Sequence, residues 1–206
     1  MKSICSLILF AGLLWGQNAE LPSKPGLYAI FNTGKGTIVA VLYEKETPAS
    51  VKNFVELAQG VKAWREPQNG AMVKRPLYNN ITFHRVLRGQ AIQSGDPTGT
   101  SGHNCGVSVP DELRLSLNFD RSGRLAVANT GEPNSGGCQF FITDDLVRDW
   151  NQKYTIFGQV VSGMDVVHAI STAPLHGDKP VDPVKLISVT ISRVGPAPGE
   201  KKKKEK

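Results

Sequence analysis

The stretch FHRVLRGQAIQSGD, residues 83–96, places Arg85 among the apolar neighbours of a strand-like segment. Two glutamines, Gln90 and Gln93, follow it, and neither a serine–histidine pair nor a pair of carboxylates lies beside it. An arginine stays charged and holds its hydrogen-bond donors in a rigid fork, so it suits a reaction that needs a positioned donor and no nucleophile. A surface arginine whose stem covers apolar neighbours is the plainer interpretation, and the strand alone leaves it open.

A second stretch, LAVANTGEPNSGGCQFFIT at residues 125–143, combines a short apolar strand, a glycine-rich loop and a returning strand. Ala128 beside Asn129 would leave backbone groups open to an extended peptide. Phe141 and its aromatic neighbour could line an apolar pocket. A tight hairpin with an ordinary phenylalanine core is equally compatible with this pattern.

The histidines and cysteines do not follow a metal-binding pattern. His84, His103, Cys105 and Cys138 lack the paired spacing of zinc ligands, so we expect no metal site. Cys5 lies in the leading apolar segment, which leaves Cys105 and Cys138 in the rest of the chain. These two are compatible with one disulfide or with two buried thiols, because the sequence does not reveal their separation.

The elements that must position these residues are mostly short strands. Thr47 suits a helix N-cap, Pro48 the first helical position and Gly60 the helix end, which predicts an amphipathic helix between them. The segment 61–80 has no sustained period and reads as a loop or a small excursion between the helix and the next strand. Strands are expected at residues 26–32, 37–43, 81–87, 91–93, 125–128, 138–143, 155–161 and 184–194, with a second helix at 163–171.

The strands outnumber the two helices, so the predicted fold is mainly β. A closed antiparallel barrel with helices over its openings fits this pattern best, and an open sandwich is the alternative.

The two ends of the chain differ from its body. Residues 1–19 combine Lys2, an apolar run and a small final residue, which predicts a secretory signal peptide; a retained anchor is the alternative. Residues 196–206 read as a disordered, lysine-rich tail. Most of the net charge of +6 lies in these ends, so the body, residues 20–195, is nearly neutral and lacks a nucleic-acid-binding pattern.

Four short motifs follow one another along the chain. They are FHRV, then Gln93 with Gly95-Asp96, then LAVANTGEPNSGGCQFFIT, and last YTIFGQVVSGMDVV. This series resembles the cyclophilin-type peptidyl-prolyl cis-trans isomerases of an exported bacterial type, over roughly residues 26–194. The resemblance implies a closed eight-stranded antiparallel barrel with two capping helices, and an isomerase that uses no cofactor. It implies binding of proline-containing peptides and of unfolded or extended client proteins. The protein is expected to be a periplasmic or secreted monomer that binds neither nucleic acid nor, once the signal is removed, a membrane.

By the same resemblance, Arg85 is the catalytic residue, because its guanidinium would lie at the prolyl nitrogen. Gln93 would brace the arginine and the peptide, Tyr154 takes the place of a pocket histidine, and Trp150 would border the pocket. The residues expected to contact substrate are Phe83, His84, Gln93, Ala128, Asn129, Gln139, Phe141, Trp150 and Tyr154.

Gln90 is the main departure from the family pattern, because it stands where the family has an aromatic wall of the proline socket. Losing part of that wall is expected to weaken proline binding by about 1–2 kcal/mol. The alternative function is therefore a module that binds or holds proline peptides with low turnover. A sugar- or nucleic-acid-binding barrel is a further possibility, and the nearly neutral body does not favour it.

Overall fold

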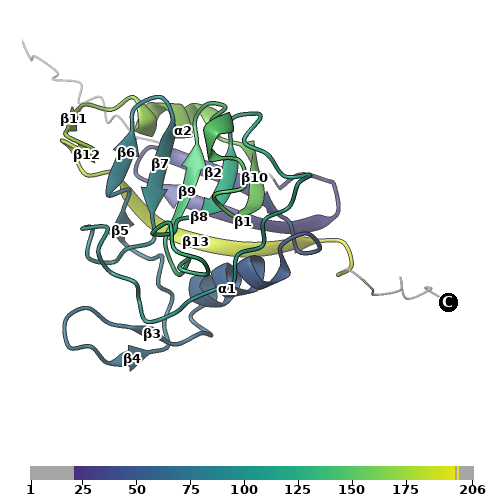
Figure 1. The fold of residues 1–206 in the computed structure, drawn as a ribbon, viewed down its shortest axis with the longest axis horizontal. Coiled ribbons are helices and arrows are strands. Elements are labelled where there is room, and N and C mark those ends of the chain that lie inside the picture. The colour runs from purple at the N-terminus through teal and green to yellow at the C-terminus, as the bar shows by residue number, and fades with distance from the viewer. Residues whose placement is uncertain (1–20, 198, 200–206) are drawn as a thin grey trace, which may run out of the picture.

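The structure, a computed structural model, describes residues 21–197 and residue 199. Its centre is a nine-stranded antiparallel sheet in the order β5-β13-β1-β2-β10-β8-β9-β7-β6 (Figure 1). The strands of this sheet are β1 (Gly26–Thr33), β2 (Gly36–Leu42), β5 (Ile81–Thr82), β6 (Arg85–Leu87), β7 (Ala91–Ser94), β8 (Arg124–Val127), β9 (Phe140–Thr143), β10 (Ile156–Ser162) and β13 (Lys185–Val194). The remaining elements are α1 (Pro48–Gln59), α2 (Met164–Ser171), the short 3-10 helix η1 (Arg148–Trp150), and two small hairpins made by β3 (Trp64–Arg65) with β4 (Met72–Val73) and β11 (Leu175–His176) with β12 (Lys179–Pro180).

The sheet curls because its two edge strands, β5 and β6, are consecutive in the chain and only Phe83 and His84 separate them. Both of these side chains are buried, which breaks the inward–outward alternation of a continuous strand. The segment expected as a single strand at 81–87 is therefore two strands. The mainly β fold with two helices is confirmed, and the sheet has nine strands because of this interruption.

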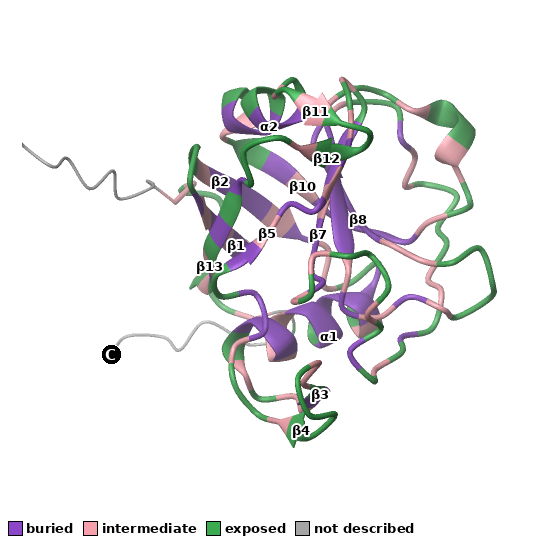
Figure 2. Ribbon diagram, turned by 90° about the vertical axis from the view of Figure 1, so that its left-hand side faces the viewer, coloured by how far each residue is buried: buried purple, intermediate pink, exposed green. Residues whose placement is uncertain are grey.

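The hydrophobic core fills the inside of the curl. Phe54 on α1 packs its ring against Phe31, Tyr78, Phe140 and Phe157, with ring centroids 5.0–5.8 Å apart. Figure 2 shows α1 below the sheet and α2 above it, each with buried residues toward the strands. The two helices therefore lie over opposite ends of the curled sheet, as the sequence predicts. None of the helices in the described ranges is long and apolar enough to cross a membrane.

The start of α1 differs in detail from the prediction. The hydroxyl of Thr47 donates to the backbone oxygen of Tyr43, so it does not cap the helix. The carboxylate of Glu112 takes that role and accepts hydrogen bonds from the backbone N–H groups of Ala49 and Ser50, at 3.2 and 2.8 Å. The end of α1 is as predicted, because Gly60 adopts a left-handed conformation.

The segment 61–80, predicted to be a loop or a small excursion, contains the β3–β4 hairpin, which projects beside α1 (Figure 1). Trp64 anchors the hairpin, because its side chain is buried and its indole N–H donates to the backbone oxygen of Arg75 at 2.8 Å. The hairpin is also bonded to the segment that carries Cys105, because the backbone N–H of Arg65 donates to the Cys105 backbone oxygen at 2.7 Å.

Candidate active site

The main cavity, of about 560 Å³, opens beside β6, β7 and the turn after β8. Segments far apart in the sequence supply its walls. The structure brings seven of the predicted site residues to it: Arg85, Gln93, Ala128, Asn129, Phe141, Trp150 and Tyr154.

Arg85 is oriented by a chain of hydrogen bonds that starts across the β6–β7 pair. Arg85 and Gln93 lie opposite one another in this pair, and Arg85 Nη1 donates to Gln93 Oε1 at 3.3 Å. The Gln93 amide donates in turn to Gln139 Oε1 at 2.8 Å. The Gln139 amide donates to the backbone oxygens of Ser101 and His103, at 3.2 and 3.1 Å. Each amide in the chain has a defined orientation, so the first of them presents its oxygen to the guanidinium.

The apolar wall of the main cavity consists of aromatic rings. Phe141 contacts Trp150 and Tyr154 edge to face, with centroids 5.4 and 5.1 Å away, and Trp150 and Tyr154 lie 5.8 Å apart. Phe119 is fully buried and stacks 5.9 Å from Phe141. Sequence reasoning missed Phe119, because it follows an aperiodic loop. Phe141, Trp150 and Tyr154 line the cavity and form a socket for a small apolar ring, and Phe119 packs behind Phe141.

Four of the predicted site residues lie outside this cavity: Phe83, His84, Gln90 and Gln139, the last of which lines a neighbouring cavity described below. Phe83 and His84 do not edge it, because both side chains are buried at the β5–β6 junction. Gln90 is exposed in the turn between β6 and β7, so it is not part of the socket wall. The register explains this, because it pairs Leu87 with Ala91, and these two line the cavity while the turn residues between them do not.

His84 is buried, and neither of its ring nitrogens makes a hydrogen bond of good geometry in the described part of the chain, although the Gln139 side chain and the Thr82 backbone interact weakly with the imidazole. Burial lowers the pKa of the His84 imidazole, and the nearby Asp96 carboxylate opposes this shift. His84 is therefore neutral and beneath the site, where it contributes to packing.

Gln139 lines a second, smaller cavity of about 130 Å³, which shares Gln93, Ala128 and Asn129 with the main cavity. Its other walls come from the glycine-rich loop before β9 and from the loop at residues 96–105, which we call the site loop. Asp96 anchors the start of this loop, accepting hydrogen bonds from Thr98 and His103. Burial alone would raise the pKa of the Asp96 carboxyl, and these hydrogen bonds outweigh it and lower the pKa.

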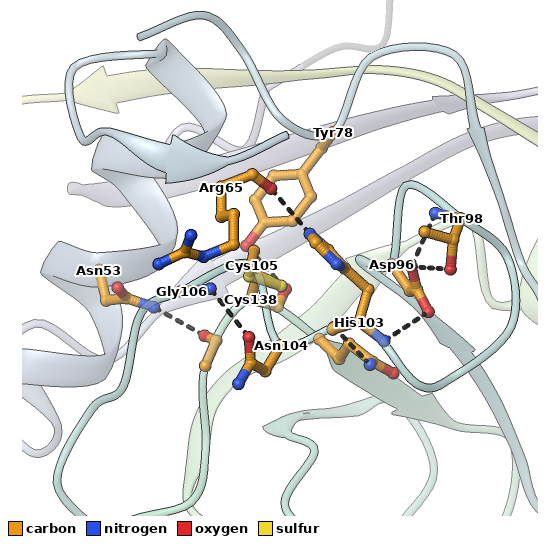
Figure 3. The surroundings of a disulfide bond; sticks show 12 residues. Asn53, Arg65, Tyr78, Asp96, Thr98, His103, Asn104, Cys105, Gly106 and Cys138 are labelled. Carbon is orange, nitrogen blue, oxygen red and sulfur yellow. Dashed lines mark hydrogen bonds between the residues drawn. A yellow bond between two sulfur atoms is a disulfide. The ribbon is translucent and has the colours of Figure 1, made fainter. Parts of the chain in front are cut away.

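A disulfide between Cys105 and Cys138, with Cα atoms 6.3 Å apart, holds the end of the site loop (Figure 3). The sequence was compatible with one disulfide or with two buried thiols, and the structure contains the disulfide. Cys138 directly precedes Gln139, and its backbone oxygen accepts a hydrogen bond from the buried Tyr78 hydroxyl at 3.0 Å. Figure 3 also shows His103 pointing to the backbone of Arg65, which it contacts at 2.8 Å. The disulfide and these hydrogen bonds tie both the site loop and the start of β9 to the core.

The backbone at the rim can accept an extended peptide. The backbone N–H of Ala128 donates to the Gln139 backbone oxygen at 3.0 Å, which holds the end of β8 against the start of β9. The side chain of Asn129 donates to the Lys153 oxygen and accepts from the Gly131 N–H. Within residues 21–197, the backbone N–H and C=O of Asn129 make no hydrogen bond. These two groups are therefore available to the main chain of a ligand.

Comparison with known proteins places this chain in a family. The family model described as "Cyclophilin type peptidyl-prolyl cis-trans isomerase/CLD" matches residues 28–191. The chain is 41% identical over 167 residues to peptidyl-prolyl cis-trans isomerase A of Mycobacterium tuberculosis, covering 80% of this chain and 91% of the relative. It is 38% identical over 169 residues to peptidyl-prolyl cis-trans isomerase B of Streptomyces anulatus, covering 80% and 96%.

Solved structures agree with the sequence comparisons. A cyclophilin-type isomerase of Cryptosporidium parvum, crystallised in the presence of the dipeptide Ala-Pro, superposes with a TM-score of 0.70 at 29% identity. The match covers 80% of this chain and 98% of that one. With a family model that spans most of the described residues and a fold shared with solved members, this chain belongs to the cyclophilin-type peptidyl-prolyl cis-trans isomerases.

Proposed function

We propose that the main cavity binds the X-Pro segment of a client chain and that Arg85 catalyses its cis–trans isomerisation. The observation that carries this assignment is the placement of the braced Arg85 guanidinium at the same cavity as the aromatic socket. Crystallisation of a relative with Ala-Pro supports a dipeptide of this kind as the ligand class.

The reaction breaks no bond. It requires a hydrogen-bond donor at the prolyl nitrogen and an apolar socket for the proline ring. Resonance gives the X-Pro amide bond a rotation barrier of about 18–20 kcal/mol. As the bond twists, the lone pair localises on the prolyl nitrogen, and a donor placed there stabilises the twisted state more than the planar one. Arg85 supplies the donor, while Phe141, Trp150 and Tyr154 take the proline ring. The backbone of Asn129 pairs with the peptide chain, which fixes the bond relative to the guanidinium.

Replacement of Arg85 tests this assignment. Removing a donor of this kind costs about 10²–10³ in rate in other enzymes, so Arg85→Ala is expected to lower kcat/KM on an Ala-Pro peptide by at least about 100-fold. The free energy of unfolding should change little, because the side chain is about 40% exposed and leaves no core cavity. Arg85→Lys should recover only part of the activity, because a lysine lacks the planar fork.

The matched control is Arg88→Ala, three residues further on, whose guanidinium donates to the Thr172 and Ala173 oxygens away from the main cavity. NMR exchange spectroscopy gives the turnover of each variant without a coupled protease. Wild-type turnover in Arg85→Ala would remove Arg85 from the catalytic role.

The alternative of a holding module with low turnover rested on Gln90. Since Gln90 is exposed and outside the main cavity, it takes no apolar area from the socket. The retained arginine, its amide brace and the three aromatic rings that line the cavity all favour isomerisation.

We also propose that this monomeric enzyme acts on unfolded or extended polypeptides in the periplasm or outside the cell. The Cys105–Cys138 disulfide supports this compartment, because disulfides persist in oxidising environments. The predicted signal peptide, residues 1–19, and most of the predicted tail, residues 196–206, lie outside the described residues. The nearly neutral body supports a client set without nucleic acid.

A further inference from the structure

A carboxylate from a distant hairpin lies against the guanidinium of Arg85. On the assignment of Arg85 proposed above, we propose that Asp178 is a positioning residue, which holds the arginine from the side opposite Gln93. Asp178 lies in the turn of the β11–β12 hairpin, 93 residues after Arg85, and it lines the main cavity. Its side chain makes an ion pair in which Arg85 Nε donates to Asp178 Oδ2 at 3.2 Å.

The hairpin is attached to the strand that carries Arg85. The N–H of Val86 donates to the backbone oxygen of Asp178 at 2.7 Å, so the hairpin turn is bonded to β6 one residue after the arginine. Gly177 has a φ of +64°, which allows the tight turn before Asp178. The N–H of Val181 donates to the Pro174 oxygen at 2.9 Å and closes the base of the hairpin. The carboxylate is thus presented on a short, hydrogen-bonded support.

The two partners of Arg85 occupy opposite edges of its guanidinium. Asp178 accepts from Nε, and Gln93 accepts from Nη1. The third nitrogen, Nη2, makes no hydrogen bond to the described part of the chain. A guanidinium fixed at Nε and Nη1 keeps its plane and offers Nη2 to the substrate.

Arg85 needs such support because its side chain is long, 41% exposed and held on the other edge by a single 3.3 Å hydrogen bond. A free arginine loses considerable rotamer entropy when it is held in one position. An exposed ion pair contributes little to fold stability. The expected consequence of the pair is therefore a correctly oriented donor in the transition state rather than a more stable fold.

Charge-removing and charge-moving variants of Asp178 test the inference. Asp178→Asn and Asp178→Ala are expected to lower kcat about five- to tenfold with KM within about twofold, because orientation matters most at the twisted bond. Asp178→Glu should restore most of kcat. Asp182→Asn is the matched control, since Asp182 is exposed, follows the same hairpin and does not contact Arg85. Its turnover should equal that of the wild type.

Salt and spectroscopy separate positioning from a structural effect. With an uncharged peptide, raising the salt from about 0.05 M to about 0.5 M should lower wild-type turnover toward that of Asp178→Asn, and the variant should not respond. The Nε–H proton of Arg85 should exchange with water slowly in the wild type and faster in Asp178→Asn. Equal turnover in Asp178→Asn and wild type, or a faster Asp178→Asn, would overturn the inference.

A double-mutant cycle keeps this inference distinct from the assignment of Arg85. If Asp178 acts through the arginine, Asp178→Ala should have almost no further effect in an Arg85→Ala background. The same loss in both backgrounds would show that the hairpin acts by another route, and the positioning role would fail while the role of Arg85 stands. Full activity in Arg85→Ala alone would instead remove the catalytic assignment itself.

Discussion

Arg85 reaches the main cavity because the register of β6 with β7 places it opposite Gln93, and the same register decides which neighbours accompany it. Leu87 and Ala91 line the cavity with them, since alternate residues of a strand share a face. Gln90 lies in the turn and is exposed. A position that the family pattern associates with an aromatic wall thus contributes nothing to the wall in this chain.

Gln90→Phe is therefore expected to leave kcat/KM within about twofold of the wild type, because the new ring would lie outside the socket. Trp150→Ala is the contrasting variant and should raise KM about tenfold, because it removes a ring from the socket wall. The two variants are compared by NMR exchange on the same Ala-Pro peptide. A large gain in Gln90→Phe would show that this side chain reaches the proline after all.

His84 gives the fold a dependence on pH. Burial lowers the pKa of its imidazole, whereas a histidine in the unfolded chain titrates near about 6.5. Below that pH the unfolded chain binds a proton that the folded chain does not bind, so stability falls as the pH falls from about 6.5 toward the lower folded pKa.

His84→Phe removes this titration and keeps a ring of similar shape. The free energy of unfolding, measured by urea denaturation, should decrease less between about pH 7.5 and about pH 5.5 in His84→Phe than in the wild type. His176→Gln, at an exposed position in the β11–β12 hairpin, serves as the control and should keep the wild-type dependence. An identical decrease in His84→Phe would show that protonation of His84 does not destabilise the fold.

At the scale of elements, the first turn of α1 is capped by a carboxylate from a distant part of the chain. Glu112 accepts hydrogen bonds from two backbone N–H groups of the first turn and from the Ser50 hydroxyl, the last at 2.8 Å. A negative charge at this end also interacts favourably with the helix dipole. α1 carries Phe54 into the core, so the cap contributes to the packing under the sheet.

Glu112→Gln should lower the free energy of unfolding by about 1–2 kcal/mol, because the cap loses its charge and part of its hydrogen bonding. Urea denaturation measures this change. Glu132→Gln, at an exposed position in the glycine-rich loop, is the control for loss of a glutamate charge and should not alter stability measurably. Equal stability of the two variants would contradict the capping role.

At the scale of the whole molecule, one disulfide connects the site to the compartment in which the chain folds. Cys105 and Cys138 are 33 residues apart, and they join the site loop to the start of β9. Closing a loop of this length stabilises a fold by about 3–4 kcal/mol in the chain-entropy view. The stability of the site loop should therefore depend on an oxidising environment.

Protein recovered from the exported fraction should resist maleimide labelling when it is denatured without a reductant. Chain expressed without residues 2–19 in the cytosol should be labelled at both cysteines. Reduction should lower the free energy of unfolding by about 3–4 kcal/mol. Labelled thiols in exported protein, or recovery from the cytosol alone, would contradict the proposed compartment.

Local patterns in the sequence were sufficient for much of this protein. The apolar, β-branched and aromatic runs of β1 and β2, the stripe on α1 and the glycine that ends it depend on neighbours in the chain, so sequence reasoning found them. The order of motifs around Arg85, Gln93 and Phe141 was also enough to predict the family and a shared cavity.

Contacts between distant segments were decided by the tertiary structure alone. The carboxylates of Glu112 and Asp178 reach their partners across 62–63 and 93 residues, and Cys105 pairs with Cys138 across 33. Gln90 lies outside the socket because the register of β6 with β7 places it in the turn between the two strands. Periodicity reports which face a residue occupies, whereas the curl of the sheet determines which distant faces meet, and that curl depends on every strand at once.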